Sequence, residues 1–208
     1  GYKAYRAYVR EQLKIITLPK SLVLYGLTGS GKTDLIQPLK NCIDLEGLAQ
    51  HRGSILGDIA KTPSSQKKFE SLLLKRILET QNEPFIILEC ESRKIGKITL
   101  PEVIFKKIKQ PWKTVLLDKS IDERVKILKA TYCEQAPKKE IIRKLKLIEK
   151  HLGKTTLNEL IQYIEQDDLD QAIKIILEKY YDIHYQKLFH DFNHTVKSDE
   201  EFLELLPQ

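Results

Sequence analysis

The sequence predicts an α/β protein with a mostly parallel sheet, helices on both faces of the sheet and a helical C-terminal extension. Short apolar runs alternate with segments of helical period in the first part of the chain, which is typical of a parallel sheet covered by helices. From Ile121 onward the pattern is helical. The predicted organisation is a connector helix at 1–20, an α/β core at 21–120, a basic helical extension packing on the core at 121–194 and an acidic tail at 195–208.

Four short apolar runs are the predicted strands. They lie at residues 22–25, 42–45, 85–89 and 114–117. A run of this length that ends at a glycine or an acid is typical of a buried parallel strand.

Helical periodicity predicts helices at 2–15, from Gly31 to Pro38, at 66–80, at 138–152 and at 168–181. Thr156 followed by Glu159 predicts a capping box at the start of a further helix. Residues 47–64 have the composition of a loop. The acidic tail is predicted to be loosely held.

The composition is typical of a cytoplasmic protein without a membrane segment. Among 208 residues, 41% are hydrophobic and 31% are charged, and no stretch approaches the roughly 18 apolar residues of a membrane helix. No signal peptide is visible, and Cys42, Cys90 and Cys133 are expected to be reduced thiols. Methionine is absent, even at position 1, which predicts a piece of a longer polypeptide.

The net charge of +6 is unevenly distributed. Residues 104–150 carry 14 Lys or Arg against 6 Asp or Glu. Such an excess favours a polyanionic partner such as nucleic acid, although a solvated lysine-rich surface would have the same composition. The residues expected to contact nucleic acid are Lys138, Lys139, Arg143 and Lys144.

Residues 26–33, GLTGSGKT, fit the phosphate-binding P-loop pattern G-x-x-x-x-G-K-[ST]. The loop follows a predicted strand and opens a predicted helix, so the fold is expected to resemble the P-loop NTPases. Backbone N–H groups of such a loop point at phosphate oxygens, Lys32 reaches the terminal phosphates and the Thr33 hydroxyl is a candidate Mg²⁺ ligand. The alternative is a glycine-rich turn that fits the pattern by chance. The phosphate-binding residues are predicted to be Gly26, Thr28, Gly29, Ser30, Gly31, Lys32 and Thr33.

Metal-bound phosphate usually requires a carboxylate from a second strand. The candidates are Glu89, Glu91 and Asp44, which stand at or just after the ends of predicted strands. Ligands in such folds bind beyond the carboxyl ends of the strands. Glu89 is the expected Mg²⁺ ligand beside Thr33, and the other acids are alternatively strand-end caps.

Two loops after predicted strands combine acids with cationic side chains. Arg52 and Arg93 suit an anion. His51 suits proton transfer, or alternatively a structural hydrogen bond. The predicted catalytic residues are Lys32, Glu46, His51, Arg52, Glu91 and Arg93. Arg124, early on a helix after a strand, stands where small P-loop kinases often place an anion-clamping arginine.

Together the segments GLTGSGKT (26–33), DLEGLAQHRGS (44–54) and LECESRKIG (88–96) resemble the P-loop domain of tRNA 2-selenouridine synthase, and YYDIHYQK (180–187) is a weaker match. Residues 1–6 resemble the stretch that follows the rhodanese domain in that family. The resemblance covers nearly the whole chain, and its most specific part is the segment 44–54.

The resemblance implies replacement of the sulfur of 2-thiouridine at the tRNA wobble position by selenium, with selenophosphate as donor. It implies an S-geranylated intermediate made from geranyl diphosphate, and a catalytic cysteine supplied by a rhodanese domain. No rhodanese domain is recognisable here. The expected partners are therefore tRNA and a rhodanese domain or subunit, and this transferase is expected to be incomplete alone, whether it is a split subunit or an excised domain.

Two other functions remain open at this stage. One is a small P-loop kinase or NTPase acting on a metabolite, with ATP or GTP in the P-loop. The other is a binding module that only presents tRNA to a partner. The segment 44–54 and the basic excess favour the transferase.

Overall fold

The computed structural model describes residues 1–59, 61–133, 136–185 and 191–207, without the side chain of Cys133. The chain divides into two compact units. The N-terminal unit comprises Gly1–Tyr25 and Lys32–Val115, and the C-terminal unit comprises Gly26–Gly31 and Leu116–Gln208. The chain therefore passes between the units within the P-loop and within one strand.

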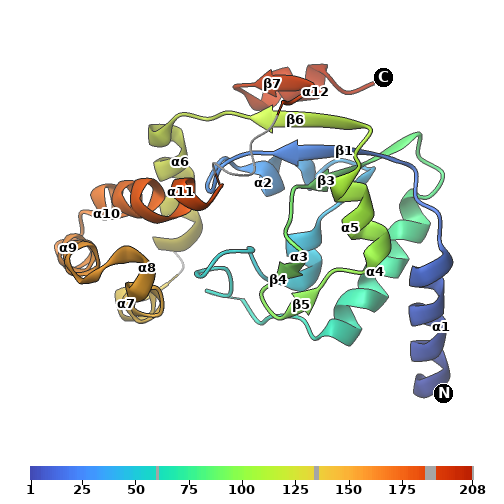
Figure 1. The fold of residues 1–208 in the computed structure, drawn as a ribbon, viewed down its shortest axis with the longest axis horizontal. Helices are drawn as coiled ribbons and strands as arrows, with labels where there is room; N and C mark the ends of the chain where they lie inside the picture. Colours follow the sequence, from blue (N-terminus) through green and yellow to red (C-terminus); the bar gives the residue numbers. More distant parts are fainter. Residues whose placement is uncertain (60, 134–135, 186–190, 208) are drawn as a thin grey trace. The chain divides into compact units, whose positions relative to one another are not determined.

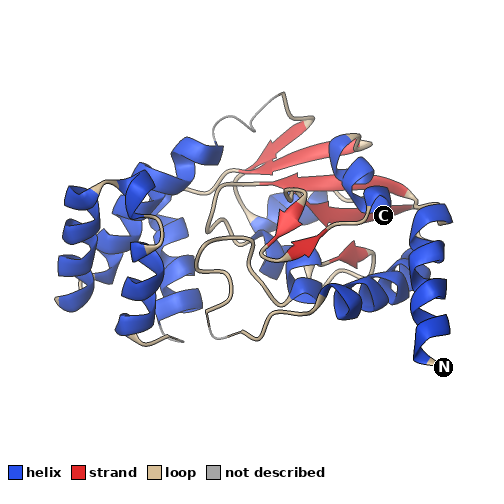
Figure 2. Ribbon diagram, turned by 60° about the horizontal axis from the view of Figure 1, so that its bottom comes forward, coloured by secondary structure: helices blue, strands red, loops and turns tan. Residues whose placement is uncertain are grey.

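The central feature is a five-stranded sheet, which confirms the predicted α/β class with a mostly parallel sheet (Figures 1 and 2). The strand order is β2-β3-β1-β6-β7. Parallel pairing joins β1 to β3, from Lys20 opposite Phe85 to Leu24 opposite Glu89, and joins β2 to β3. The strand bounds are β1 Lys20–Tyr25, β2 Cys42–Ile43, β3 Phe85–Glu89, β6 Lys113–Leu117 and β7 His194–Val196.

In the N-terminal unit, helices cover the strands through one apolar core. Val9 and Leu13 of α1 and Phe69 and Leu73 of α4 are all buried in it. The helices are α1 Tyr2–Ile15, α2 Lys32–Ile36, α3 Leu45–Ala49, α4 Gln66–Thr80 and α5 Glu102–Lys109. A short antiparallel pair, β4 Lys94–Ile95 and β5 Ile98–Thr99, completes the unit.

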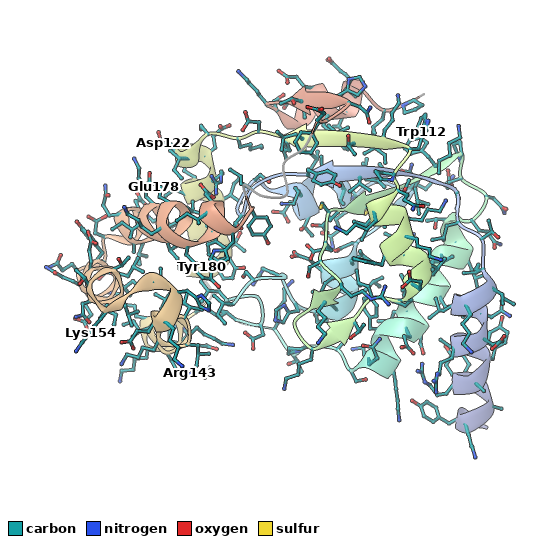
Figure 3. All side chains as sticks on the ribbon, viewed as in Figure 1. Trp112, Asp122, Arg143, Lys154, Glu178 and Tyr180 are labelled. Atoms are coloured by element: carbon teal, nitrogen blue, oxygen red, sulfur yellow. The ribbon has the colours of Figure 1, made fainter. Side chains whose placement is uncertain are left out.

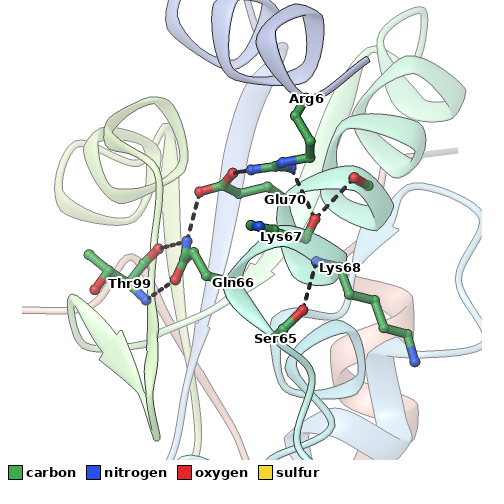
Figure 4. A network of polar contacts seen from close by, with 8 residues as sticks. Arg6, Ser65, Gln66, Lys67, Lys68, Glu70 and Thr99 are labelled. Carbon is green, nitrogen blue, oxygen red and sulfur yellow. Dashed lines mark hydrogen bonds and ion pairs between the residues drawn. The ribbon is translucent and has the colours of Figure 1, made fainter. Parts of the chain in front are cut away.

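A polar network fixes helix α4 to its neighbours (Figure 4). Arg6 of α1 donates to Glu70 and to the carbonyl of Lys67. The Gln66 amide donates to the Thr99 carbonyl at 2.9 Å and accepts from the Thr99 N–H at 2.8 Å. Because its apolar face lies in the core, α1 is packed along the N-terminal unit rather than merely leading into it.

The C-terminal unit is mainly helical (Figure 1). Its apolar residues line one face of each long helix, for example Leu157, Leu160 and Ile164 in α9. The elements are α6 Ile121–Leu128, the π-helical turn η1 Lys129–Cys133, α7 Lys138–Lys146, α8 Glu149–Leu152, α9 Lys154–Glu165, α10 Leu169–Ile176, the π-helical turn η2 Leu177–Tyr181, α11 Asp182–Tyr185 and α12 Asp199–Glu204.

Three helix predictions differ from the structure. The helix predicted at 138–152 is two helices, because Ile148 leaves the helical conformation at φ −108° and ψ 15°. The capping box at Thr156 is wrong, since α9 already begins at Lys154 after Gly153. The segment predicted as one helix at 168–181 passes from α10 into η2.

Two segments predicted as irregular are ordered. Residues 47–49, predicted as loop, belong to α3, which begins at Leu45 where the strand was predicted to end, because the Asp44 side chain accepts the Gly47 N–H at 2.7 Å and caps the helix. The C-terminal tail is not loosely held. Strand β7 joins the sheet, the Asp118 N–H donates to the Val196 carbonyl at 2.8 Å, and Phe202 is fully buried.

Candidate functional site

The glycine-rich half of the P-loop lies against helix α6 within the C-terminal unit. Gly29 has φ +83°, and a Cβ atom there would lie 2.7 Å from the Leu128 side chain. Only glycine accepts both the left-handed backbone and this close approach. The tight turn that a P-loop needs is therefore supported by packing and not only by its own glycines.

Arg124 holds this half of the P-loop in place. Its Nε donates to the Thr28 carbonyl at 2.9 Å, and its two terminal nitrogens donate to the Asp182 carboxylate at 3.0 and 2.6 Å. The Arg124 side chain is only 3% exposed. Its guanidinium is therefore bound to protein groups, and its expected role as an anion clamp stays a prediction. Asp182 lies within the segment 180–187, where only the weaker family resemblance pointed to it.

The other half of the P-loop begins helix α2 in the N-terminal unit. The Thr33 hydroxyl donates to Glu89 Oε2 at 2.8 Å and lies 3.3 Å from Glu46 Oε2. Glu89 is the last residue of β3, beside the P-loop strand β1. The predicted pair of Thr33 and Glu89 thus comes together, and Glu46 joins it.

Three carboxylates form a cluster next to Thr33. Glu46, Glu89 and Glu91 each offer an oxygen, and these oxygens all lie within 4.8 Å of one another. Burial and the neighbouring carboxylates raise the pKa of each of the three to about 8, while the Lys32 ammonium opposes the shift. Like charges this close favour a shared proton or a bound cation. Hard oxygen ligands of this kind suit Mg²⁺ or Mn²⁺.

Asp44, the remaining candidate carboxylate, is a helix cap beside this cluster and interacts with Glu89. Its side chain accepts the Gly47 N–H, and a Cβ atom at Gly47 would lie 2.1 Å from Asp44 Oδ2. The cap begins α3 so that Glu46 stands in the first turn of that helix.

His51 joins the two acidic loops of the N-terminal unit. Its Nδ1 accepts the Gly53 N–H at 3.1 Å. A Cβ atom at Gly57 or Gly96 would lie 2.7 or 2.6 Å from the imidazole ring. The ring is therefore enclosed by the backbone of both glycines, which ties the segment 44–54 to the β4–β5 turn.

The two predicted anion-binding arginines make protein contacts. Arg93 pairs with Glu102 at 2.6 Å and stacks over the Phe105 ring at 4.9 Å. Arg52 donates to the Ile59 carbonyl at 3.2 Å. Their predicted catalytic role, like that of His51, stays a prediction.

Of the four predicted nucleic-acid contacts, Lys139 and Arg143 are exposed on α7, and Lys144 is half-buried. Arg143 is labelled in Figure 3. Lys138 forms an ion pair with Asp167, so its charge is partly neutralised.

An aromatic group that sequence reasoning missed lies in the same unit (Figure 3). The Tyr180 and His184 rings are 4.7 Å apart, and His151 stands 6.2 Å from Tyr180. The histidines are exposed and Tyr180 is half-buried. Tyr180 and His184 are four residues apart in sequence, but spacing could not bring His151 to them, because α8 is distant in sequence from η2.

Burial is the strongest influence on the two described thiols, Cys42 and Cys90. Cys42 is buried, and Cys90 is half-buried beside Glu91. Burial raises the pKa of both thiols above the usual range. The side chain of Cys133 lies outside the described residues.

Across the described ranges, no helix combines the length and apolar character needed to cross a membrane.

Comparison with known proteins gives a consistent family. The model of the tRNA 2-selenouridine synthase AAA domain matches residues 19–204. A tRNA 2-selenouridine synthase of Hydrogenovibrio crunogenus is 33% identical over 89% of this chain and 59% of its own length. The enzyme of Shewanella pealeana is 31% identical over the same shares. An uncharacterized protein of Methanocaldococcus jannaschii is 33% identical over 79% of this chain and 78% of its own length.

No solved structure matches the chain. The chain spans about three-fifths of the length of the two synthases. Because the family model covers most of the chain and the P-loop lies on the expected parallel sheet, this protein belongs to the family of tRNA 2-selenouridine synthase AAA domains.

Proposed function

We propose that this chain is the P-loop part of a tRNA 2-selenouridine synthase, which binds a prenyl diphosphate in the P-loop and tRNA on its basic helices. The observation that carries the proposal is the position of Lys32 and Thr33 beside the carboxylates of Glu46 and Glu89. This is the arrangement that a metal-bound diphosphate requires. Membership of the tRNA 2-selenouridine synthase family supports tRNA as the substrate, and the prenyl diphosphate is part of the proposal.

In the proposed reaction, the sulfur of 2-thiouridine attacks C1 of geranyl diphosphate. A C–S bond forms, the C–O bond to diphosphate breaks, and the N3 proton of the uridine ring passes to water. Charge therefore develops on the leaving diphosphate. The P-loop N–H groups and the Lys32 ammonium stabilise that charge. Mg²⁺ held by Thr33 and Glu89 would supply further charge neutralisation.

The tRNA part of the proposal rests on the C-terminal unit. Arg143 and Lys139 are exposed cations, which suit phosphate contacts. The exposed rings of His151 and His184 beside Tyr180 suit stacking on an unpaired base. Exchange of the geranylated sulfur for selenium is assigned to the complete enzyme, with selenophosphate and a rhodanese cysteine.

The test is incubation of the chain with thiolated tRNA, geranyl diphosphate and Mg²⁺, followed by digestion to nucleosides and mass spectrometry. The expected product is S-geranyl-2-thiouridine. The Lys32→Ala variant is expected to form none, and the matched control Lys40→Ala, an exposed lysine paired with Glu83, is expected to be unaffected. Absence of the product with and without a rhodanese partner would contradict the proposal, and ATP hydrolysis in its place would favour the kinase or NTPase alternative.

A further inference from the structure

The carboxylate cluster beside Lys32 contains more acid than a P-loop magnesium site needs. Thr33 and one strand-end carboxylate are enough to hold Mg²⁺ against a bound phosphate. Here Glu46 from α3 and Glu91 after β3 bring two more carboxylates within 4.8 Å. The surplus acids stand where the negatively charged diphosphate is proposed to bind.

One carboxylate oxygen of the cluster lacks a partner. Among the described residues, Glu89 Oε1 is buried and accepts no hydrogen bond, and Glu89 as a whole is 1% exposed. Its other oxygen accepts the Thr33 hydroxyl at 2.8 Å. A buried carboxylate oxygen without a donor is costly. A cation among the three carboxylates would supply the missing interaction.

The local charge points to a divalent ion. When ionised, the three glutamates outweigh Lys32 by two negative charges, which one divalent cation neutralises. Asp44 also faces Glu46 and Glu89, and Lys61 opposes the Asp44 charge. The all-oxygen donor set selects a hard cation such as Mg²⁺, Mn²⁺ or Ca²⁺.

We propose that Glu46, Glu89 and Glu91 form a preformed divalent-cation site that fills before the diphosphate binds. Without the cation, three carboxylates next to Lys32 and Thr33 repel a diphosphate. With the cation in place, the same residues bind the diphosphate. The binding order rests on the proposed function, whereas the cation site itself does not.

In the first experiment the full chain is titrated with Mn²⁺ alone, and free Mn²⁺ is measured by its electron paramagnetic resonance signal. We expect one site in the absence of any diphosphate. Glu91→Gln and Glu89→Gln should each weaken Mn²⁺ binding by at least about tenfold. The matched control Glu11→Gln, at an exposed residue of helix α1, should leave it unchanged. Because Glu91 is only half-buried, its variant is expected to keep the wild-type circular dichroism spectrum. Absence of Mn²⁺ binding by the folded wild type, or unchanged binding by Glu91→Gln, would overturn the site.

The second experiment measures pyrophosphate binding by calorimetry, in EDTA and at fixed free Mn²⁺. The wild type is expected to bind at least about tenfold more tightly with Mn²⁺. In Glu91→Gln the difference in pyrophosphate affinity between the two conditions should be smaller. Affinity in EDTA should rise, because one repelling carboxylate is gone, and affinity with Mn²⁺ should fall, because the cation is held less tightly. Equal wild-type affinity in both conditions would overturn the binding order. Mn²⁺ binding without pyrophosphate binding in either condition would refute the diphosphate proposal and the order, and would leave the cation site standing.

Discussion

Replacing Asp182 with asparagine is expected to destabilise the protein by about 3 kcal/mol, because Arg124 would keep a buried charge without its anion. Arg124 is 3% exposed and Asp182 is 19% exposed. Removing one partner of a buried ion pair typically costs about 3–5 kcal/mol, and the partial exposure of Asp182 places this pair near the lower end. The asparagine amide, with a single oxygen, would also accept only one of the two hydrogen bonds that now measure 3.0 and 2.6 Å.

The assay is urea unfolding monitored by circular dichroism, which gives the free energy of unfolding of each variant. The slope of that free energy against urea concentration is compared among the variants. Asp167→Asn is the matched control. Asp167 pairs with Lys138, but the two side chains are 72% and 40% exposed, so the loss should stay below about 1 kcal/mol. Asparagine also tolerates the left-handed backbone at this position, φ +63°. If Asp182→Asn cost no more than this control, the Arg124 pair would be a solvated surface pair and the reasoning would fail.

A functional consequence accompanies the loss of stability. Arg124 donates to the Thr28 carbonyl inside the P-loop, so Arg124→Lys should loosen the loop even where the variant remains folded. We expect diphosphate affinity to fall by about tenfold, on the scale of one lost hydrogen bond from a charged group. A folded Arg124→Lys variant with wild-type affinity would show that the contact only stabilises the fold.

Further outcomes are expected at four places. Lys32→Ala should weaken diphosphate binding by about 1.5–3 kcal/mol with an unchanged circular dichroism spectrum, and calorimetry showing unchanged affinity would contradict the P-loop assignment. Phe202→Ala should destabilise the protein by about 3–5 kcal/mol, since Phe202 is fully buried; a loss below about 1 kcal/mol in urea unfolding would mean that the tail contributes little. Burial raises the pKa of Cys90, so iodoacetamide at pH 8 should alkylate it more slowly than free cysteine by mass spectrometry, and an equal rate would refute this. The last change replaces four basic residues with glutamine: Lys138, Lys139, Arg143 and Lys144. In gel-shift titrations, the dependence of tRNA affinity on salt concentration should become flatter, by up to about one unit of slope per lost phosphate contact. An unchanged slope would mean that these residues form a solvated face that does not contact tRNA.

Local sequence signals predicted the α/β part of the fold well. The helix at 66–80 and the strand at 85–89 have the predicted bounds, because a continuous apolar periodicity and a wholly buried run leave few alternatives. In the segment 138–152 the apolar residues keep helical spacing across the break between α7 and α8. Periodicity alone therefore could not show that two helices are present. The tail was predicted from its charge, whereas the pairing of β7 in the sheet and the burial of Phe202 hold it in place.

The candidate site was predictable as far as it follows strand ends. Parallel strands place their carboxyl ends at one edge of a sheet, and this rule brought Glu89 and Glu91 to the P-loop. The same rule also favoured Asp44, because the sequence alone does not distinguish an aspartate that caps a helix from one that binds a metal. The pair of Arg124 and Asp182 could not be predicted, since no local pattern relates residues 58 positions apart.

The enclosure of His51 changes how the most specific family segment is interpreted. An acid, a histidine and an arginine in one loop indicate catalysis when they are read as isolated side chains. In the structure the ring accepts the Gly53 N–H and lies against the backbone of Gly57 and Gly96. A side chain at either glycine would collide with the ring, so these residues constrain one another by shape. The constraint joins the loop that carries Glu46 to the loop that carries Glu91. His51 therefore ties the segment that carries Glu46 to the segment that follows Glu91, and its observed contacts are those of a residue that holds two loops together.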